Sequence, residues 1–327
     1  MLSSVAIKNT ITNPDHIPVL LDEVIKGLDL KDGGLYIDGT FGAGGYSVAI
    51  LEEKKCNVIA IDRDPEVLEK GKNIVDAFQG RLKLVQGRFG DVQKILKKEG
   101  VKSVDGIVLD LGISSMQVDD RLRGFSFLRD GPLDMRMEKS GMSAADAINT
   151  LSEKDLTDII SRYGEERHAS RVAKAIVKIR KVRPFMRTIH LADTIRSEVR
   201  RSRAGIDPAT RTFQALRIYI NDELGELERG LIGAENVLAA NGRLAAVSFH
   251  SLEDRIVKSF IRDRSKRAPG PSRHKPVLQD LEKKISFKMI NMRALTPSRR
   301  EIISNPRSRS ARLRVAEKLL SKPNYLN

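Results

Sequence analysis

The stretch YIDGTFGAGGYS, which runs from Tyr36 to Ser47, decides the fold of this 327-residue chain. It places an acidic residue at the end of an apolar run, then a turn rich in glycine, and then the beginning of a helical pattern. Glycine allows positive φ angles and a close approach of the backbone to a ligand, and the N–H groups at a helix start favour anionic ligand groups. The stretch therefore predicts a nucleotide-binding turn, although NAD enzymes and purely structural turns use the same arrangement.

The segments around this turn alternate between strand and helix patterns. An amphipathic stretch spans Pro65–Phe78, and apolar runs occur at Leu35–Ile37, Val58–Ile61, Leu82–Val85 and Gly106–Leu111. Strands that alternate with helices indicate βαβ units and a mainly parallel sheet. Residues 16–115 therefore predict an α/β, Rossmann-like fold.

Acidic residues lie at the ends of three of these apolar runs: Asp38 and Asp62 directly follow their runs, and Asp110 is the last residue but one of its run. In open α/β folds, ligands bind at the carboxyl ends of the parallel strands. Asp62 stands about 20 residues beyond Gly42, the spacing at which a carboxylate accepts hydrogen bonds from ribose hydroxyls. An acid at Asp38, directly ahead of the glycines, favours the cationic aminoacyl end of S-adenosylmethionine over a pyrophosphate. Phe89, after the third run, is a candidate for stacking on adenine and equally for plain core packing.

A different pattern fills residues 120–215, which lack strand signals. Apolar residues recur there at helical spacing, and the opposite face of one such helix carries Arg171, Lys174, Lys178 and Lys181. Further on, Phe213–Leu238 predicts one long helix that ends near Asn241-Gly242, and Leu244–Phe249 predicts another strand. We therefore expect an α/β domain built from residues 1–119 and 216–327, the latter with a basic tail, and interrupted by an inserted all-α domain at 120–215.

Basic residues are concentrated in two regions of the chain, whose formal net charge is +15. Residues 255–327 hold 20 Lys and Arg against 5 Asp and Glu, and residues 162–203 hold 13 against 4. One such run is usually a solvated surface, but two on an otherwise balanced chain favour a polyanionic partner.

Several classes of protein are excluded or disfavoured. Cys56 is the only cysteine, which rules out an internal disulfide and Cys-based zinc sites. The five histidines show no metal-ligand spacing, so we predict no metal. No apolar run is long enough for a transmembrane helix, and the first residues lack the pattern of a signal peptide. We expect a cytoplasmic protein without a membrane partner.

Longer motifs run from residue 16 to about residue 317. They include HIPVLLDE at His16–Glu23, IDGTFGAGG at Ile37–Gly45, AIDRDP at Ala60–Pro65, LDLGISS at Leu109–Ser115, SFHSLEDR at Ser248–Arg255 and NPRSRS at Asn305–Ser310. With these motifs the chain resembles the bacterial 16S ribosomal RNA cytosine-N4 methyltransferase family. The resemblance implies a class I S-adenosylmethionine-dependent methyltransferase fold with an inserted all-α domain. It also implies methylation of one cytosine in the decoding region of 16S ribosomal RNA.

The resemblance implies a set of cofactor contacts, position by position. These are Gly44, Gly45, Tyr46, Asp62, Phe89, Asp110 and Gln117, to which the pattern around the turn adds Asp38 and Gly42. The chain departs from the family pattern at two positions. Tyr46 stands where many members have His, and Met116 stands where the family commonly has Pro ahead of Gln117.

The predicted catalytic residue is Asp110, because an acceptor near the amino hydrogens of cytosine would stabilise positive charge as it develops on the nitrogen. Arg171 and Lys174 are predicted to bind the RNA substrate. Phe249 and His250 are predicted to do the same, with structural packing as their alternative.

The expected partner is 16S ribosomal RNA or the small ribosomal subunit, and a homodimer stays open. A methyltransferase acting on DNA or protein would share the same cofactor site. Asp38 and Asp110 disfavour an NAD oxidoreductase or a non-catalytic nucleic-acid binder.

Overall fold

The computed structural model describes residues 18–199, 205–265 and 285–320. The chain forms two compact units, one of residues 1–112 with 226–327 and the other of residues 113–225. The inserted unit extends beyond the predicted range of 120–215 at both ends, because the loop after β4 and the whole of helix α11 fold with it. Part of the predicted basic tail, at 266–284 and 321–327, lies outside the described residues, as does His16 of the first motif.

The first unit contains a seven-stranded sheet in the order β3-β2-β1-β4-β5-β7-β6. The strands are β1 (Leu35–Asp38), β2 (Asn57–Asp62), β3 (Leu82–Gln86), β4 (Val104–Asp110), β5 (Leu238–Ser248), β6 (Phe287–Met289) and β7 (Arg312–Lys318). Strands β1 to β5 pair in parallel, whereas β7 runs antiparallel to both β5 and β6. The sheet confirms the predicted mainly parallel α/β class.

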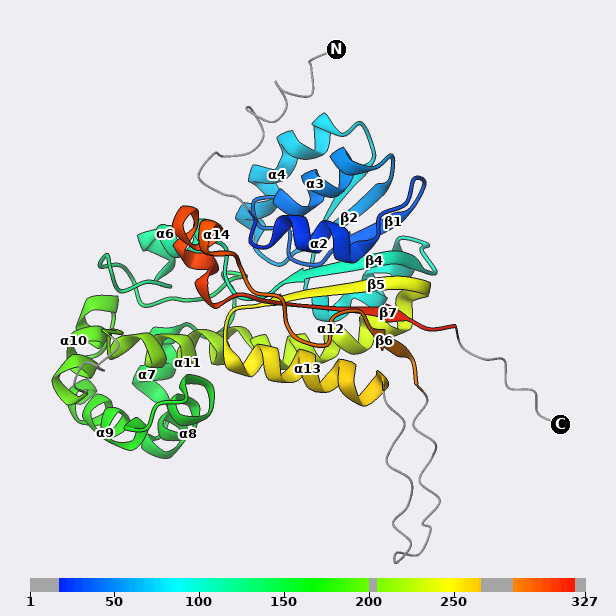
Figure 1. Ribbon diagram of the computed structural model, residues 1–327. Coiled ribbons are helices and arrows are strands. Elements are labelled where there is room, and N and C mark those ends of the chain that lie inside the picture. Colours follow the sequence, from blue (N-terminus) through cyan, green and yellow to red (C-terminus); the bar gives the residue numbers. More distant parts are fainter. Residues whose placement is uncertain (1–17, 200–204, 266–284, 321–327) are drawn as a thin grey trace, which may run out of the picture. The chain divides into compact units, whose positions relative to one another are not determined.

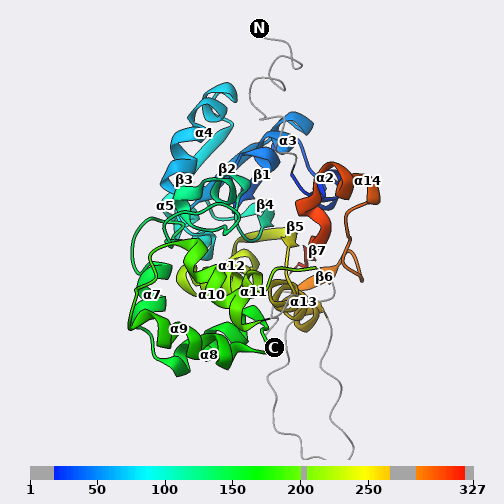
Figure 2. The same ribbon diagram turned by 90° about the vertical axis from the view of Figure 1, so that its left-hand side faces the viewer.

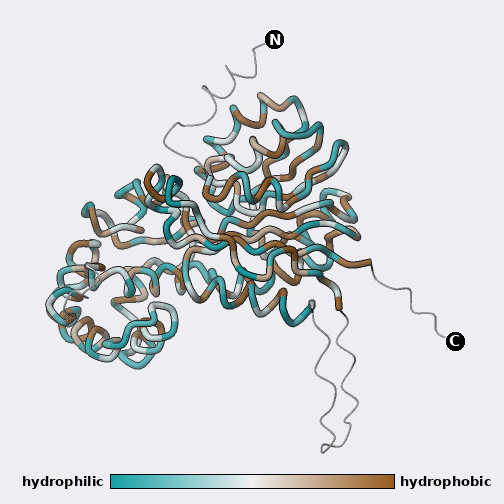
Figure 3. The backbone as a smooth tube through the Cα atoms, in the orientation of Figure 1, coloured by the Kyte–Doolittle hydropathy of each residue, from teal (hydrophilic) through white to brown (hydrophobic). Residues whose placement is uncertain are grey.

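Helices cover both faces of this sheet (Figure 1). One face carries α2 (Leu21–Leu28), α3 (Gly45–Glu53) and α4 (Pro65–Ala77). The other carries α5 (Val92–Lys98), α12 (Glu223–Val237) and α13 (Ser251–Ser265), whose apolar residues share one core cluster with the strands. Hydrophobic residues follow the strands between these two layers (Figure 3). The short elements are η1 (Phe89–Asp91), α14 (Arg299–Ser304) and η3 (Pro306–Ser310).

The sequence signals around β2 and α4 show why these elements form where they do. Four consecutive residues of β2, Val58–Ile61, are buried, as expected for a strand covered on both faces. Helix α4 begins at Pro65, whose fixed φ suits the first helical position. The side chain of Asp64 caps this helix by accepting a hydrogen bond from the Glu66 N–H at 3.1 Å. Local chemistry therefore fixes the chain direction immediately after the strand end at Asp62.

Within its described residues the second unit is built from helices and one isolated bridge, between Pro132 and Arg187. The helices are α6 (Ser115–Asp119), η2 (Arg121–Arg123), α7 (Ala144–Thr150), α8 (Glu153–Gly164), α9 (Ala169–Arg180), α10 (Thr188–Glu198) and α11 (Ala209–Asn221). They enclose a separate apolar cluster that includes Ile160, Val172 and Phe213. Within the described ranges, no helix of either unit is long and apolar enough to cross a membrane.

The prediction of one long helix over Phe213–Leu238 is wrong. Helix α11 ends at Asn221, Asp222 adopts a left-handed conformation with φ of 50°, and α12 begins at Glu223. The next strand is also longer than the predicted Leu244–Phe249, since β5 already begins at Leu238. Its pairing with β4 shifts register between the pairs Val104↔Leu238 and Gly106↔Arg243. Residues 238–242, near which the helix was predicted to end, therefore belong to the start of β5.

Candidate active site

Three carboxylates lie at one edge of the sheet. Asp38, Asp62 and Asp110 are the last residues of β1, β2 and β4. Strand β1 pairs with β2 on one side and with β4 on the other, so the three strand ends are neighbours. Between β1 and β4 the chain changes the direction in which it adds strands, and open α/β folds bind ligands in the crevice at such a point. The predicted clustering of the three acids is therefore present in the structure.

The glycine turn needs its glycines for its own packing. Gly42 and Gly44 have φ angles of 53° and 81°, in the left-handed region. A Cβ on Gly44 would lie 2.9 Å from both the Phe41 ring and Ile74, and a Cβ on Gly45 would collide with Pro18. The turn therefore brings the start of α3 close to the strand ends whether or not a ligand is present. Ligand contacts by Gly42, Gly44 and Gly45 stay predictions.

Asp38 stabilises the glycine turn through buried hydrogen bonds. Its side chain is fully buried, and its Oδ1 accepts a hydrogen bond from the Thr40 N–H at 3.1 Å. Its Oδ2 accepts one from the Ser47 hydroxyl at 2.7 Å. Burial raises the pKa of Asp38 from 3.8 to about 6, against the lowering effect of these hydrogen bonds. The structure thus gives Asp38 a role that the sequence did not suggest, which is to tie the strand end to helix α3.

Asp62 fastens the same turn from the neighbouring strand. Its Oδ2 accepts a hydrogen bond from the Gly42 N–H at 2.9 Å, and its Oδ1 accepts one from the Asp64 N–H at 2.9 Å. Desolvation raises the pKa of this carboxyl group, and the backbone hydrogen bonds oppose the rise. Each oxygen has a further lone pair after these bonds, so the carboxylate can still accept from ribose hydroxyls as predicted.

Arg63, the residue after Asp62, forms a buried ion pair that the sequence analysis did not predict. The Arg63 Nη1 lies 2.8 Å from the Glu226 Oε2, and the two side chains are only 10% and 1% exposed. Glu226 belongs to α12, and this helix packs against the loop after β3. A Cβ on Gly90 would meet the Glu226 Cγ at 3.0 Å, and a Cβ on Gly230 would meet the Phe89 ring at 2.5 Å. One helix therefore supports the loops that follow β2 and β3.

Phe89 is half-buried and packs against the core cluster through this contact with α12. That placement fits the packing alternative, and the stacking of Phe89 on adenine stays a prediction. Tyr46 is 4% exposed, and its hydroxyl donates a hydrogen bond to the Val19 carbonyl oxygen. Burial raises the pKa of Tyr46 well above 10, and the nearby Asp110 and Asp38 add to the rise. The Tyr46 side chain therefore supports the residues that precede α2, and the ligand contact predicted for Tyr46 stays a prediction.

Gln117 lies in the other unit, where its side chain is buried. Its Oε1 accepts a hydrogen bond from the Ser114 N–H at 3.1 Å, and the Gln117 N–H donates in return to the Ser114 hydroxyl at 3.3 Å. This reciprocal pair is a capping box at the start of α6. The cofactor contact predicted for Gln117 stays a prediction.

Asp110 differs from the other two acids because part of it lacks a partner. Its Oδ1 is buried and has no hydrogen-bond partner in the described part of the chain. Its own N–H donates to the Thr40 hydroxyl at 2.7 Å, which joins the end of β4 to the glycine turn. Burial raises the pKa of Asp110 well above 3.8, and the charges of Asp38 and Glu253 raise it further. A buried acceptor without a hydrogen-bond donor lowers the stability of the fold. The Asp110 Oδ1 is therefore suited to accept a hydrogen bond from a ligand.

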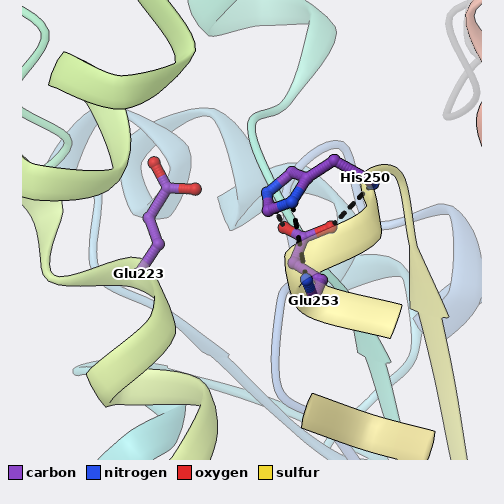
Figure 4. Close-up of side chains that lie close together, drawn as sticks. All are labelled: Glu223, His250 and Glu253. Carbon is purple, nitrogen blue, oxygen red and sulfur yellow. Dashed lines mark hydrogen bonds and ion pairs between the residues drawn. The ribbon is translucent and has the colours of Figure 1, made fainter. Parts of the chain in front are cut away.

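Phe249 and His250 follow the end of β5, beside Asp110. A Cβ on Gly112 would lie 3.9 Å from the Phe249 ring, so this ring stands next to the chain that leaves β4. Glu253, which is 2% exposed, contacts both residues, and its side chain lies against that of His250 in Figure 4. Its Oε2 accepts from the Phe249 N–H at 2.8 Å and the His250 N–H at 3.3 Å. Its Oε1 lies 3.1 Å from the His250 Nε2. The structure thus brings both predicted residues to the carboxyl edge and adds Glu253, which the sequence analysis missed.

Arg171 and Lys174 lie on α9 in the second unit. Both are exposed, as are Lys178 and Lys181, whereas Val172, Ala173 and Ile176 are buried, so the predicted division of this helix into two faces is confirmed. The Arg171 Nη1 donates to the Glu198 carbonyl oxygen at 3.4 Å, and Arg171 lines a surface hollow with His168 and Ser197. RNA binding by this face stays a prediction.

The sequence of this chain is similar to those of known proteins over most of its length. Residues 13–319 match the family model of the MraW methylase family. The chain is 57% identical over 301 residues to the ribosomal RNA small subunit methyltransferase H of Paramagnetospirillum magneticum, covering 92% of this chain and 95% of that protein. It is 54% identical over 306 residues to the protein of the same name from Rhodospirillum rubrum, covering 93% and 94% of the two chains. The chain belongs to the MraW methylase family.

Proposed function

We propose that this protein transfers a methyl group from S-adenosylmethionine to the N4 amine of one cytosine in the decoding region of 16S ribosomal RNA. The similar proteins from Paramagnetospirillum magneticum and Rhodospirillum rubrum, named as methyltransferases of small-subunit ribosomal RNA, support the substrate class. The choice of the N4 atom rests on the sequence motifs. The observation that carries the proposal in the structure is the orphaned Oδ1 of Asp110 at the carboxyl edge.

The residues at this edge fit the donor. Asp62 offers oxygens to ribose hydroxyls, and the glycine turn lets the backbone lie close to the aminoacyl end. When bound, S-adenosylmethionine would supply a methyl group activated by a cationic sulfonium. Asp38 and Asp110 would place negative charge on the side of the sheet where that cation must lie. Both acids have raised pKa values without a cation, so a bound cation would favour their ionised forms.

The acceptor amine is a weak nucleophile, because its lone pair is delocalised into the cytosine ring. Orientation is therefore the main contribution that the protein can make. The Asp110 Oδ1 would accept a hydrogen bond from the amine and so stabilise the positive charge that develops on nitrogen. The Asp110 carboxylate, whose pKa is raised, is also suited to take up the released proton. The Phe249 ring next to Gly112 is placed to pack against the base.

The test uses purified enzyme, labelled donor, and small-subunit RNA offered naked and as partly assembled subunits. After digestion to nucleosides, the label is expected in N4-methylcytidine. Label in C5-methylcytidine, methyladenosine or a ribose-methylated nucleoside would overturn the proposal, as would transfer only to DNA or protein.

The role of Asp110 is tested with Asp110→Asn, which keeps the shape of the side chain and removes its charge. We expect the single-turnover rate to fall by about 100-fold, the scale on which one electrostatic contact to the transition state acts. Asp105→Asn is the matched control on the same strand, because Asp105 lies at its amino end and accepts a hydrogen bond from the Leu35 N–H at 2.9 Å. Donor binding is measured for both variants. An Asp110→Asn enzyme with unchanged rate would remove Asp110 from the chemistry.

A further inference from the structure

The segment from Arg299 to Arg312, here called the arginine segment, is strongly basic. It comprises α14, η3 and the first residue of β7. Its five arginines are all exposed and are Arg299, Arg300, Arg307, Arg309 and Arg312. Glu301 is its only acidic residue, and the Glu301 Oε1 already accepts a hydrogen bond from the Leu20 N–H at 2.8 Å. The positive charge of the segment is therefore not balanced from within.

Neighbouring carboxylates neutralise little of this charge. Asp254 lies 3.0 Å from the Arg312 Nη1 and also pairs with Arg314. In the described part of the chain, Arg299, Arg300 and Arg309 have no carboxylate within ion-pair distance. Like charges held close together repel one another, so such a group is expected to attract an anion. The segment also contains arginine and no lysine, and the planar guanidinium binds phosphate oxygens in pairs.

The fold holds the arginine segment at the edge of the sheet that carries Asp110. The contact between Leu20 and Glu301 joins α14 to the start of α2, which lies beside it in Figure 2. The preceding residue, Val19, accepts the hydrogen bond from Tyr46 of the glycine turn. On β7, Arg312 pairs in register with Ser248, the last residue of β5. The segment is thus tied to the glycine turn at one end and adjoins the end of β5 at the other.

We propose that the arginine segment binds the phosphodiester backbone of the RNA beside the nucleotide that is methylated. The inference rests on the proposed function, because it takes the acceptor to be an RNA that enters at this edge. A base that reaches Asp110 brings its flanking phosphates to the same edge. Exposed guanidinium groups there would fix the strand without reading its sequence.

The test replaces three arginines at once, as Arg299→Gln, Arg300→Gln and Arg309→Gln. Each lost phosphate contact should reduce the magnitude of the slope of log binding constant against log salt by about 0.7 to 0.9, so we expect a reduction of about 2 to 3 for the triple variant. The KM for RNA should rise roughly tenfold near 0.15 M salt. The affinity for S-adenosylhomocysteine and kcat at saturating RNA should stay at their wild-type values.

The matched control removes the same charge at the opposite edge of the sheet. Lys97, Lys98 and Lys102 are exposed; the first two end α5, and Lys102 lies shortly before β4. Their combined replacement by Gln should change neither the salt slope nor the KM for RNA by more than the general effect of net charge. A second variant, Arg299→Lys, Arg300→Lys and Arg309→Lys, should keep the wild-type salt slope but only part of the affinity, because the paired contacts are lost.

The outcomes separate the two proposals. If the wild-type enzyme methylates no form of small-subunit RNA, the proposed function fails. If it does methylate the RNA and the arginine variant matches the lysine control in slope and KM, the arginine segment is not a phosphate-binding surface. If the arginine variant loses affinity for S-adenosylhomocysteine in parallel, the segment acts on the glycine turn and the inference is equally overturned.

Discussion

Replacement of Asp62 by Ala should weaken donor binding more than any other single change in the loop after β2. The side chain holds two backbone N–H groups, of Gly42 and Asp64, each at 2.9 Å. It is also the carboxylate that we expect the ribose hydroxyls to reach. The substitution therefore has two effects, one on the order of the loop and one on the ligand, and they can be separated.

The effect on the ligand follows from hydrogen bonds to a charged group, which contribute about 1.5 to 3 kcal/mol. The dissociation constant of S-adenosylhomocysteine should therefore rise by about 10- to 150-fold. The effect on the protein is the loss of two acceptors, each worth about 1 to 3 kcal/mol when a buried donor is left without a partner. We expect the free energy of unfolding to fall by about 2 to 4 kcal/mol, with water replacing part of the lost contacts.

Calorimetric titration with S-adenosylhomocysteine, at a temperature where the variant is folded, measures the first effect. Asp64→Ala is the control, because Asp64 caps α4 in the same loop and its loss should cost only about 1 kcal/mol of stability. An Asp62→Ala protein that binds the ligand within twofold of wild type would refute the ribose contact. Equal weakening by Asp64→Ala would show that loop order, and not the ribose contact, determines the affinity.

Three further predictions concern other parts of the chain. Charge reversal of Arg171 and Lys174 should flatten the salt dependence of RNA binding and leave donor affinity intact; an unchanged slope in filter binding would return α9 to an ordinary solvated surface. The native protein binds the Asp38 proton more tightly than the unfolded chain does, since burial raises this pKa from 3.8 to about 6. The free energy of unfolding should therefore decrease by about 2 kcal/mol between pH 4 and pH 6 on account of this group, and denaturant titrations of Asp38→Asn should lack that decrease. Glu226→Gln should raise the dissociation constant of S-adenosylhomocysteine by roughly three- to tenfold, whereas Glu317→Gln, which breaks a 2.7 Å ion pair with Arg243 on β5, should lower the melting temperature without that change.

Local signals in the sequence were sufficient to predict the edge of the sheet at which the three acids meet. Apolar runs that end in Asp38, Asp62 and Asp110 gave the strand ends, because burial on both faces leaves a continuous apolar pattern and the turn residues mark its limit. Parallel pairing then requires the three acids to meet at one edge. No knowledge of distant contacts was needed for this part of the fold.

Contacts between residues far apart in the sequence could not be predicted from local signals. The ion pair between Arg63 and Glu226 joins residues 163 positions apart, and neither residue has a local pattern that indicates the other. Ser47 could have been suspected as a partner for Asp38, because it lies in the first turn of α3, directly after the glycine turn that follows the strand end. The role of Asp38 as an internal support is visible only when its full burial is known.

The wrong helix over Phe213–Leu238 shows what the apolar period cannot detect. The period continues across residue 222, and the nearest glycine, Gly225, lies three positions beyond the break. Tertiary contacts make the break: the Asn221 side chain donates to the Met135 carbonyl oxygen at 2.8 Å and accepts from the Met137 N–H at 2.9 Å. These bonds hold the end of α11 in the second unit, and Asp222 interrupts the helix in a left-handed conformation that Asp tolerates better than most residues.

The break also has a consequence for the site. The α/β unit resumes at Glu226, in the first turn of α12. Its first residue is therefore the partner of Arg63, next to the carboxylate expected to hold the ribose. The loops after β2 and β3 can then be fixed by the α/β unit alone, from residues that the inserted unit does not supply.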